Sequence, residues 1–168
     1  VSKTMDENHI RLAHQAGCNL LGENKVQEAW GKSQAMSDLV DLKWSVIGHL
    51  QSNKAKLVAK FASEFQALDA LNTAEILDRC LQREGRTLEV FVQVNTSAEP
   101  SKYGLAPEDV ADFMAQLSPF KNLRVKGLMT LAEFSSDADR VRACFIRLRI
   151  LRDQLAGVYG HLKLSMGM

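Results

Sequence analysis

The sequence predicts an α/β fold on a parallel sheet, and a (β/α)8 TIM barrel without its N-terminal segment and final strand/helix unit fits best. Short apolar segments of strand length alternate with longer amphipathic segments throughout the 168 residues, a pattern typical of βαβ units. No GxGxxG or GxxxxGK[ST] turn follows the first strand, although an open, doubly wound nucleotide-binding sheet carries one. A complete barrel needs eight strands and about 200 residues or more, whereas seven strand segments are found here. The doubly wound sheet is the alternative that pattern alone leaves open.

Seven segments have the length and the β-branched or aromatic content of strands. They begin near Val1, Leu20, Trp44, Phe65, Glu89, Arg124 and Leu162. The first is clipped, because the chain opens on Val1 rather than on a methionine, inside what reads as a strand. We therefore expect residues 1–168 to form one barrel domain that is incomplete at both ends.

Helical segments separate these strands. Apolar residues follow the i, i+3, i+4, i+7 spacing of one helix face in two clear cases. These residues are Val110, Phe113, Met114 and Leu117 in the first case, and Val141, Phe145, Leu148, Leu151 and Leu155 in the second. Each set predicts a helix that packs on the sheet through that face.

Capping residues mark several predicted helix ends. Asp6 is expected as an N-cap, and Gly17 as the residue that follows a helix C-cap. Asn24 and Gln27 have the spacing of a capping box, and Gly157 stands where the last long helix is expected to end.

Composition excludes several classes of protein. Apolar residues make up 46% and charged residues 24% of the chain, which is ordinary for a globular protein and unlike a disordered tail or a disulfide scaffold. The balance of 21 basic against 20 acidic residues leaves a charge of +1, so no overall field attracts nucleic acid. No segment approaches the roughly 18 apolar residues of a membrane helix, and no signal peptide is recognised. We expect a cytoplasmic protein with neither a nucleic-acid nor a membrane partner.

Three cysteines, Cys18, Cys80 and Cys144, lie far apart in the sequence and form no CxxC pair. Zinc binding and redox chemistry are therefore disfavoured. We expect buried free thiols in a reducing compartment.

The ends of the predicted strands carry small and polar residues, and function collects there in both α/β architectures. Lys3 ends the first strand, so its amine is expected to enter the barrel mouth. Desolvation and neighbouring cations can lower the pKa of such a lysine and free a nucleophilic amine that forms a Schiff base with an aldehyde. A solvated lysine is the plain alternative. At the last strand, Ser165 and Gly167 suit a phosphate site built from backbone N–H groups, or only a turn.

Six sequence elements occur in a set order: VSKT, GENKVQE, WSVIGHLQSNK, VNTSAEPSKYGL, GLMTL and LSMGM. Together they resemble the pyridoxal phosphate homeostasis protein family, the single-barrel relatives of alanine racemase. The combination of GHLQSNK with the SK(x)GL element is the most specific part, and the match spans the whole chain. The resemblance implies a (β/α)8 barrel that binds pyridoxal 5′-phosphate (PLP).

The resemblance also assigns residues to the cofactor. Lys3 matches the lysine that forms the covalent aldimine, and Asn24 matches a residue that lines the cofactor beside this lysine. Ser165 and the backbone of Gly167 match the phosphate-side loop.

Two further positions carry over with less defined roles, and two depart from the family pattern. Met129 matches a position under the cofactor, and His49 belongs to a shared rim motif. Ser45 and Lys25 replace the histidine and tyrosine that are commoner in the family. Neither of these two side chains is expected to touch the cofactor.

The family pattern continues past LSMGM into a further helix and an eighth strand with a VRIG motif, which is not found here. Its arginine faces the pyridine nitrogen, and its following residues complete the phosphate site. A chain that naturally ended at residue 168 would therefore bind the cofactor poorly.

Two main functions compete. A carrier that buffers PLP and supplies it to PLP-dependent apoenzymes needs only Lys3 and the phosphate loop. An amino-acid racemase needs a second base, and Tyr103 and Tyr159 are the two tyrosines of the chain, both expected as partly buried aromatics. We favour the carrier, as a monomer, over a slow racemase-like enzyme. The basic segment 137–156 suggests a third class, a nucleic-acid binder, but a solvated helix face explains it adequately.

Overall fold

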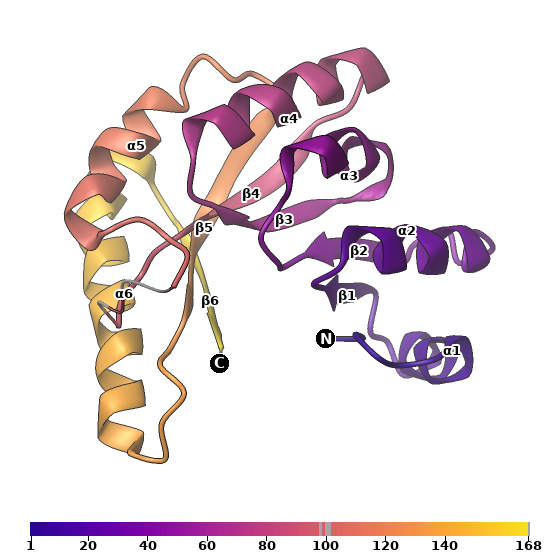
Figure 1. The fold of residues 1–168 in the computed structure, drawn as a ribbon, viewed down its shortest axis with the longest axis horizontal. Helices are drawn as coiled ribbons and strands as arrows, with labels where there is room; N and C mark the ends of the chain where they lie inside the picture. The colour runs from indigo at the N-terminus through magenta and orange to yellow at the C-terminus, as the bar shows by residue number, and fades with distance from the viewer. Residues whose placement is uncertain (98, 100–101, 168) are drawn as a thin grey trace.

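The computed structural model describes residues 1–97, 99 and 102–167. One sheet of six parallel strands runs through it (Figure 1). The strands are β1 (Leu20–Glu23), β2 (Lys43–Val46), β3 (Glu64–Leu68), β4 (Leu88–Gln93), β5 (Leu123–Leu131) and β6 (Lys163–Gly167). Their order in the sheet is β1-β2-β3-β4-β5-β6, so each strand pairs with its neighbours in sequence.

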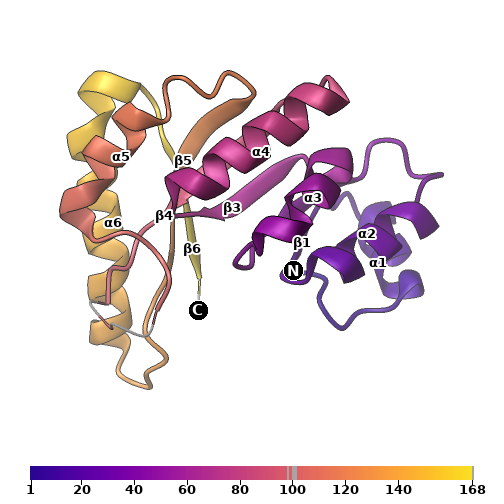
Figure 2. The same ribbon diagram turned by 45° about the horizontal axis from the view of Figure 1, so that its top comes forward.

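This order decides between the two predicted architectures. A doubly wound sheet reverses direction at a switch point, whereas these strands progress one way, as in a barrel wall. The sheet is therefore part of a TIM-type barrel, with β1 and β6 as its two edges in the described chain. Both views place the N-terminus beside β1 and the chain end at β6 (Figures 1 and 2).

Helices cover the outer face of the sheet (Figure 1). They are α1 (Glu7–Gln15), α2 (Val26–Ala35), α3 (Ala55–Phe61), α4 (Leu71–Glu84), α5 (Val110–Gln116) and α6 (Ala138–Tyr159), with 3₁₀ turns η1 (Ser52–Lys54) and η2 (Pro107–Asp109). The predicted inner face of α5 is confirmed, because Val110, Phe113, Met114 and Leu117 are all buried. On α6, Leu148 and Leu155 are buried and the other predicted residues are half-buried or more exposed.

The main core lies between the helices and the outward side chains of the strands. Val90 and Val92 on β4 pack there with Leu77 of α4 and Leu148 of α6, all four fully buried. Each such side chain contributes roughly 1.5–3 kcal/mol of hydrophobic stabilisation. The opposite, inward face of the sheet carries both polar and apolar side chains, and this face holds the candidate site.

The expectation of a seventh strand at the N-terminus is wrong. Val1–Thr4 is not a strand in the structure, although the Ser2 amide donates to the Gly22 carbonyl at 2.9 Å. This single backbone bond makes no ladder, and Thr4 adopts a left-handed φ of 68° two residues later.

The helix caps were predicted with mixed success. Asp6 caps α1 by accepting a hydrogen bond from the His9 amide, and Gly17 follows the helix with a φ of 93°, so both predictions are confirmed. The capping box is wrong, since Lys25 is the N-cap of α2 and no side chain caps it. The helix α6 passes Gly157 and ends at Tyr159, where Gly160 is the C-cap.

Two further expectations concern the burial of the cysteines and the absence of a membrane-spanning helix. Cys144 is buried, but Cys18 is exposed at the surface, because it lies in the turn after α1. None of the helices in the described ranges is both long enough and apolar enough to span a bilayer.

Candidate functional site

A cleft of about 700 Å³ lies on the inward face of the sheet. Residues from both edge strands and from the loops at strand ends line it: Val1, Lys3, Leu20, Gly22, Asn24, Ser45, Ile47, Gly48, Gln66, Met129, Thr130, Leu131, Ser165, Met166 and Gly167. We call it the interior cleft. Five of the six predicted site residues lie on its wall, and these are Lys3, Asn24, Met129, Ser165 and Gly167.

Lys3 lies on the β1 side of the interior cleft. Its side chain is exposed, whereas the sequence led us to expect a desolvated amine. The difference arises because β1 is a sheet edge, so Lys3 projects from a short segment at the border of the cleft. An exposed amine is accessible to a ligand and to competing amines from solvent.

A buried charge network fixes the residue before Lys3. Glu23 is fully buried, and its Oε1 accepts from the Ser2 hydroxyl at 2.8 Å and from the Lys32 ammonium at 2.7 Å. Lys32 also donates to the Ser2 carbonyl and to Glu28, both at 2.8 Å. Desolvation acts to lower the pKa of Lys32, but the hydrogen bonds to Glu23 and Glu28 raise it above its ordinary value. Lys32 is therefore a fixed cation behind the Lys3 segment.

The loops after β1 and β2 touch at Asn24. A Cβ on Gly48 would overlap the backbone oxygen of Asn24, so only glycine permits this approach. The contact keeps the exposed Asn24 on the wall of the interior cleft.

A chain of hydrogen bonds crosses the interior cleft from β6 to β2. The Ser165 hydroxyl donates to Gln66 Oε1 at 2.6 Å, and the Gln66 amide donates to Glu64 Oε1 at 2.5 Å. Glu64 Oε1 also accepts from the Ser45 hydroxyl at 2.6 Å. Because Ser165 already donates its proton to Gln66, its oxygen is left as an acceptor in this arrangement. An anion near Ser165 must then be held by backbone N–H groups or must reorient the hydroxyl.

Met129 is buried on β5, in register with Ser165 on β6. It adds an apolar surface beside this polar chain. A Cβ on Gly167 would meet no atom within 4 Å, so there is open space at this end of the cleft.

The structure places His49 outside the interior cleft. Its exposed ring stacks on Tyr103, with 4.0 Å between the ring centroids and 14° between the planes. The stack joins the loop after β2 to the loop after β4. The neighbouring SNK segment forms η1, whose residues do not line the cleft either.

Sequence reasoning missed the polar floor of the cleft. Ser45 lines it, although we expected this side chain to stand clear of a cofactor, and Gln66 was not considered. A signal was present, because Glu64 and Gln66 alternate with apolar residues in one strand and so share its inward face.

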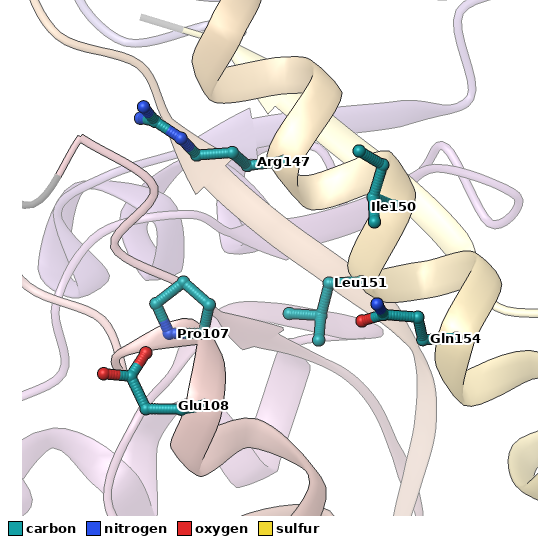
Figure 3. Close-up of a pocket in the computed structure, with 6 residues that line it drawn as sticks. All are labelled: Pro107, Glu108, Arg147, Ile150, Leu151 and Gln154. Carbon is teal, nitrogen blue, oxygen red and sulfur yellow. The ribbon is translucent and has the colours of Figure 1, made fainter.

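A second cavity of about 390 Å³ lies on the outer surface between η2 and α6 (Figure 3). Pro107, Ile150 and Leu151 provide apolar walls. The Arg147 guanidinium extends away from these side chains and donates to the Thr96 carbonyl at 2.7 Å. No residue predicted to bind a ligand lies there.

Comparisons with known proteins agree with the fold and show the family. The family model described as alanine racemase, N-terminal domain, matches residues 5–168. The pyridoxal phosphate homeostasis protein of Aquifex aeolicus is 35% identical over 99% of this chain and 74% of its own length. That of Pseudomonas aeruginosa is 39% identical over 100% of this chain and 72% of its own length. The chain belongs to the pyridoxal phosphate homeostasis protein family. The resemblance of its sequence motifs to this family is thereby confirmed.

Solved structures similar to this family member share its fold. PipY of Synechococcus elongatus has been solved without PLP, with a TM-score of 0.88 and 30% identity over 99% of this chain and 87% of that chain. PipY with PLP bound gives a TM-score of 0.81 over the same shares. An alanine racemase of Clostridium difficile, at 13% identity, gives a TM-score of 0.80 over 96% of this chain and 44% of that one. The racemase comparison supports the barrel fold alone.

Proposed function

We propose that the chain binds PLP in the interior cleft, attaches it covalently through Lys3, and acts as a cytoplasmic carrier rather than as an enzyme. The observation that carries this proposal is the common location of Lys3, from the N-terminal segment, and Ser165 and Gly167, from β6, on one cleft. Family membership and the PLP-bound structure of the similar PipY support it.

The residues of the cleft fit PLP, which combines an aldehyde, an aromatic ring and a phosphate. Lys3 offers an amine on the β1 side. Met129, Ile47 and Leu131 offer apolar surface for a ring. Gly167, with open space around its Cβ position, allows a phosphate to approach the backbone of β6.

Each residue then has a defined task. When bound, PLP supplies an aldehyde that condenses reversibly with a primary amine. Lys3 presents that amine, which reacts in its unprotonated form, and its exposure lets other amines exchange with it for release. Asn24 can donate a hydrogen bond from its amide beside Lys3. The hydrogen bonds that link Ser165, Gln66, Glu64 and Ser45 fix the orientation of these polar side chains at the base of the cleft.

Among the described residues that line the cleft, none is a second base of the kind that racemisation requires. Lys3 alone among the described lining residues carries a titratable side chain. Tyr103 is 58% exposed and stacks on His49, and Tyr159 packs against the main core. Neither tyrosine lines the cleft, so the described residues offer a side-chain base for one face of a substrate carbon, whereas racemisation uses both faces. This supports the carrier over a slow racemase-like enzyme.

We further propose PLP-dependent apoenzymes as recipients, a monomeric state, and neither a nucleic-acid nor a membrane partner. The arginines of α6 support the absence of a nucleic-acid role, because acidic residues pair with four of the five. The pairs are Arg140–Glu133, Arg142–Asp139, Arg149–Asp153 and Arg152–Asp153.

The decisive experiment is chemical labelling of the PLP-loaded protein. Borohydride reduction and mass spectrometry are expected to find the label on Lys3, lost in Lys3→Ala and retained in Lys54→Ala, since Lys54 lies in η1 away from the cleft. Fragmentation of the labelled peptide separates Lys3 from the α-amino group of Val1. A label on Lys54 would reassign the site, and rapid racemisation that disappears in Lys3→Ala would refute the carrier.

A further inference from the structure

We infer that Glu23 is a positioning residue for Lys3, acting through Ser2 and Lys32. This inference rests on the proposed function, because it concerns how the reactive amine is held at the interior cleft. Glu23 itself faces α2 rather than the cleft and does not line the site.

The Lys3 segment depends on side chains for its place. In the part of the chain that the structure describes, its backbone bonds to the sheet are limited to the Ser2 amide and the Gly22 carbonyl. No regular ladder extends to Lys3 or Thr4. Side-chain contacts must therefore determine where the segment lies.

Ser2 is where these contacts converge. It is 4% exposed, and each of its polar groups is engaged. Its hydroxyl donates to Glu23 at 2.8 Å, and its carbonyl accepts from Lys32 at 2.8 Å and from the Met5 amide at 3.0 Å. Glu23 and Lys32 also bind each other at 2.7 Å, so the three residues form a closed triangle beside Lys3.

The burial of this triangle points to a role beyond packing. The Glu23 side chain is 0% exposed, and its Oε2 has no hydrogen-bond partner among the described residues. A buried ion pair loses much of its attraction to desolvation, and an apolar pair of similar size is often as stable. What an apolar pair lacks is a donor and an acceptor for Ser2, and this is what Glu23 and Lys32 provide.

Strain next to Lys3 makes the triangle necessary. Thr4 is β-branched yet holds a φ of 68°, a left-handed conformation that such residues avoid. Strained residues persist where the surroundings over-determine them. Without the triangle, the turn from Ser2 to Thr4 keeps the backbone bond to Gly22 and the bond from the Thr4 amide to Glu28 at 3.3 Å. It loses the contacts that fix Ser2, and we therefore expect Lys3 to shift.

Glu23→Gln tests the inference with two ligands. It keeps the shape of the side chain and an acceptor oxygen, but it removes the negative charge that holds the Lys32 ammonium, and Lys32 in turn binds the Ser2 carbonyl. PLP has the aldehyde that reacts with Lys3, and pyridoxine 5′-phosphate has an alcohol in its place. We expect the rate of borohydride-trappable labelling by PLP to fall about tenfold or more, since a misplacement of 1 Å can cost about a hundredfold. The affinity for pyridoxine 5′-phosphate should stay within about twofold, because the cleft walls remain.

Two further variants separate positioning from folding. Ser2→Ala removes the hydroxyl bond to Glu23 but leaves the Glu23–Lys32 pair and the Lys32 bond to the backbone carbonyl of residue 2. It should therefore also slow labelling, even if Glu23→Gln folds poorly. Asp78→Ala is the matched control, because Asp78 accepts from the Asn122 amide at 2.8 Å and lies outside the cleft lining. It should lower stability and leave the labelling rate unchanged.

The outcomes are distinguishable from those of the proposed function. If the unmodified chain is not labelled at Lys3, the proposed function fails. If it is labelled and both Glu23→Gln and Ser2→Ala react at its rate, the positioning role is refuted. Equal loss of both ligands in these variants also refutes it, because Glu23 would then merely maintain the fold.

Discussion

Gly48 shows how one missing side chain shapes the interior cleft. Gly48→Ala places a methyl group against the backbone oxygen of Asn24, so the loops after β1 and β2 must separate. We expect a loss of roughly 1–3 kcal/mol in the free energy of unfolding, as for other overpacked sites, and weaker PLP binding because Asn24 moves. Chemical denaturation and ligand titration measure the two effects.

Gly31→Ala is the control for this prediction. Gly31 lies within α2, where a Cβ would meet no atom within 4 Å. This substitution should stabilise the chain by about 0.5–1 kcal/mol, the usual difference between alanine and glycine in a helix. Equal stability of Gly48→Ala and the unmodified chain would contradict the proposed close approach.

The candidate site could be predicted in part, because strand ends are visible in a sequence. Lys3, Asn24 and Ser165 were expected at such ends. Asn24 does follow β1, whereas Ser165 lies within β6 and Lys3 belongs to no strand, yet all three line one cleft. The roles of Glu23 and Gln66 depend on partners that are distant in sequence, such as Lys32 from α2 and Ser165 from β6. His49 was assigned to the cofactor site because it belongs to a shared motif. In the structure it stacks on Tyr103 outside the cleft, and sequence spacing does not reveal this contact.

At the scale of elements, α1 packs through the buried Ile10 onto Leu21, Met36 and Trp44, and exposed ion pairs add to this attachment. Arg11 donates to Asp38 at 2.6 Å, and His14 lies 2.7 Å from Asp41. Hydrogen bonds from Arg11 and His14 lower the pKa values of Asp38 and Asp41, and the His9 amide lowers that of the N-cap Asp6. Three ionised carboxylates, Asp6, Asp38 and Asp41, therefore contribute to the stability of α1 in its place.

We expect acid to weaken this attachment. A carboxyl group with a lowered folded-state pKa stabilises the fold above its unfolded pKa, about 3.9 for aspartate, and loses this effect as the pH falls through the folded value. The urea midpoint should accordingly begin to fall below about pH 5, one unit above that unfolded value, and should keep falling until the pH has passed the lowered folded-state values. The double variant Asp38→Asn, Asp41→Asn should show a flatter profile. An unchanged profile in this variant would assign the acid sensitivity to other groups.

Elements were predicted best where local pattern and tertiary packing agree. The six strands found in the structure all appear in the sequence as apolar segments, and α5 buries the face that its spacing indicates. Val1–Thr4 fails as a strand because strand character needs a partner ladder, and Thr4 turns away from β1. The end of α6 was misplaced because a glycine within a helix, such as Gly157, is tolerated when packing continues beyond it.

For the whole molecule, the order of the strands explains why one cleft receives residues from both ends of the chain. A sheet that progresses in one direction curves until its edges approach each other. Lys3 and Asn24 come from the β1 edge, and Ser165 and Gly167 come from β6. A single small molecule in the cleft therefore contacts two segments more than 100 residues apart in the sequence.

Binding of PLP should for this reason stabilise both edges together. We expect amide hydrogen exchange to slow in β1 (Leu20–Glu23) and β6 (Lys163–Gly167) when PLP is added, with little change in α4, which packs on the outer face. Exchange reports local opening, and a ligand that binds only the closed arrangement suppresses it by mass action. In Lys3→Ala the protection of β1 should be reduced more than that of β6, because only the covalent link at the first edge is lost. Protection confined to one edge in the unmodified chain would show that the ligand does not bridge the cleft.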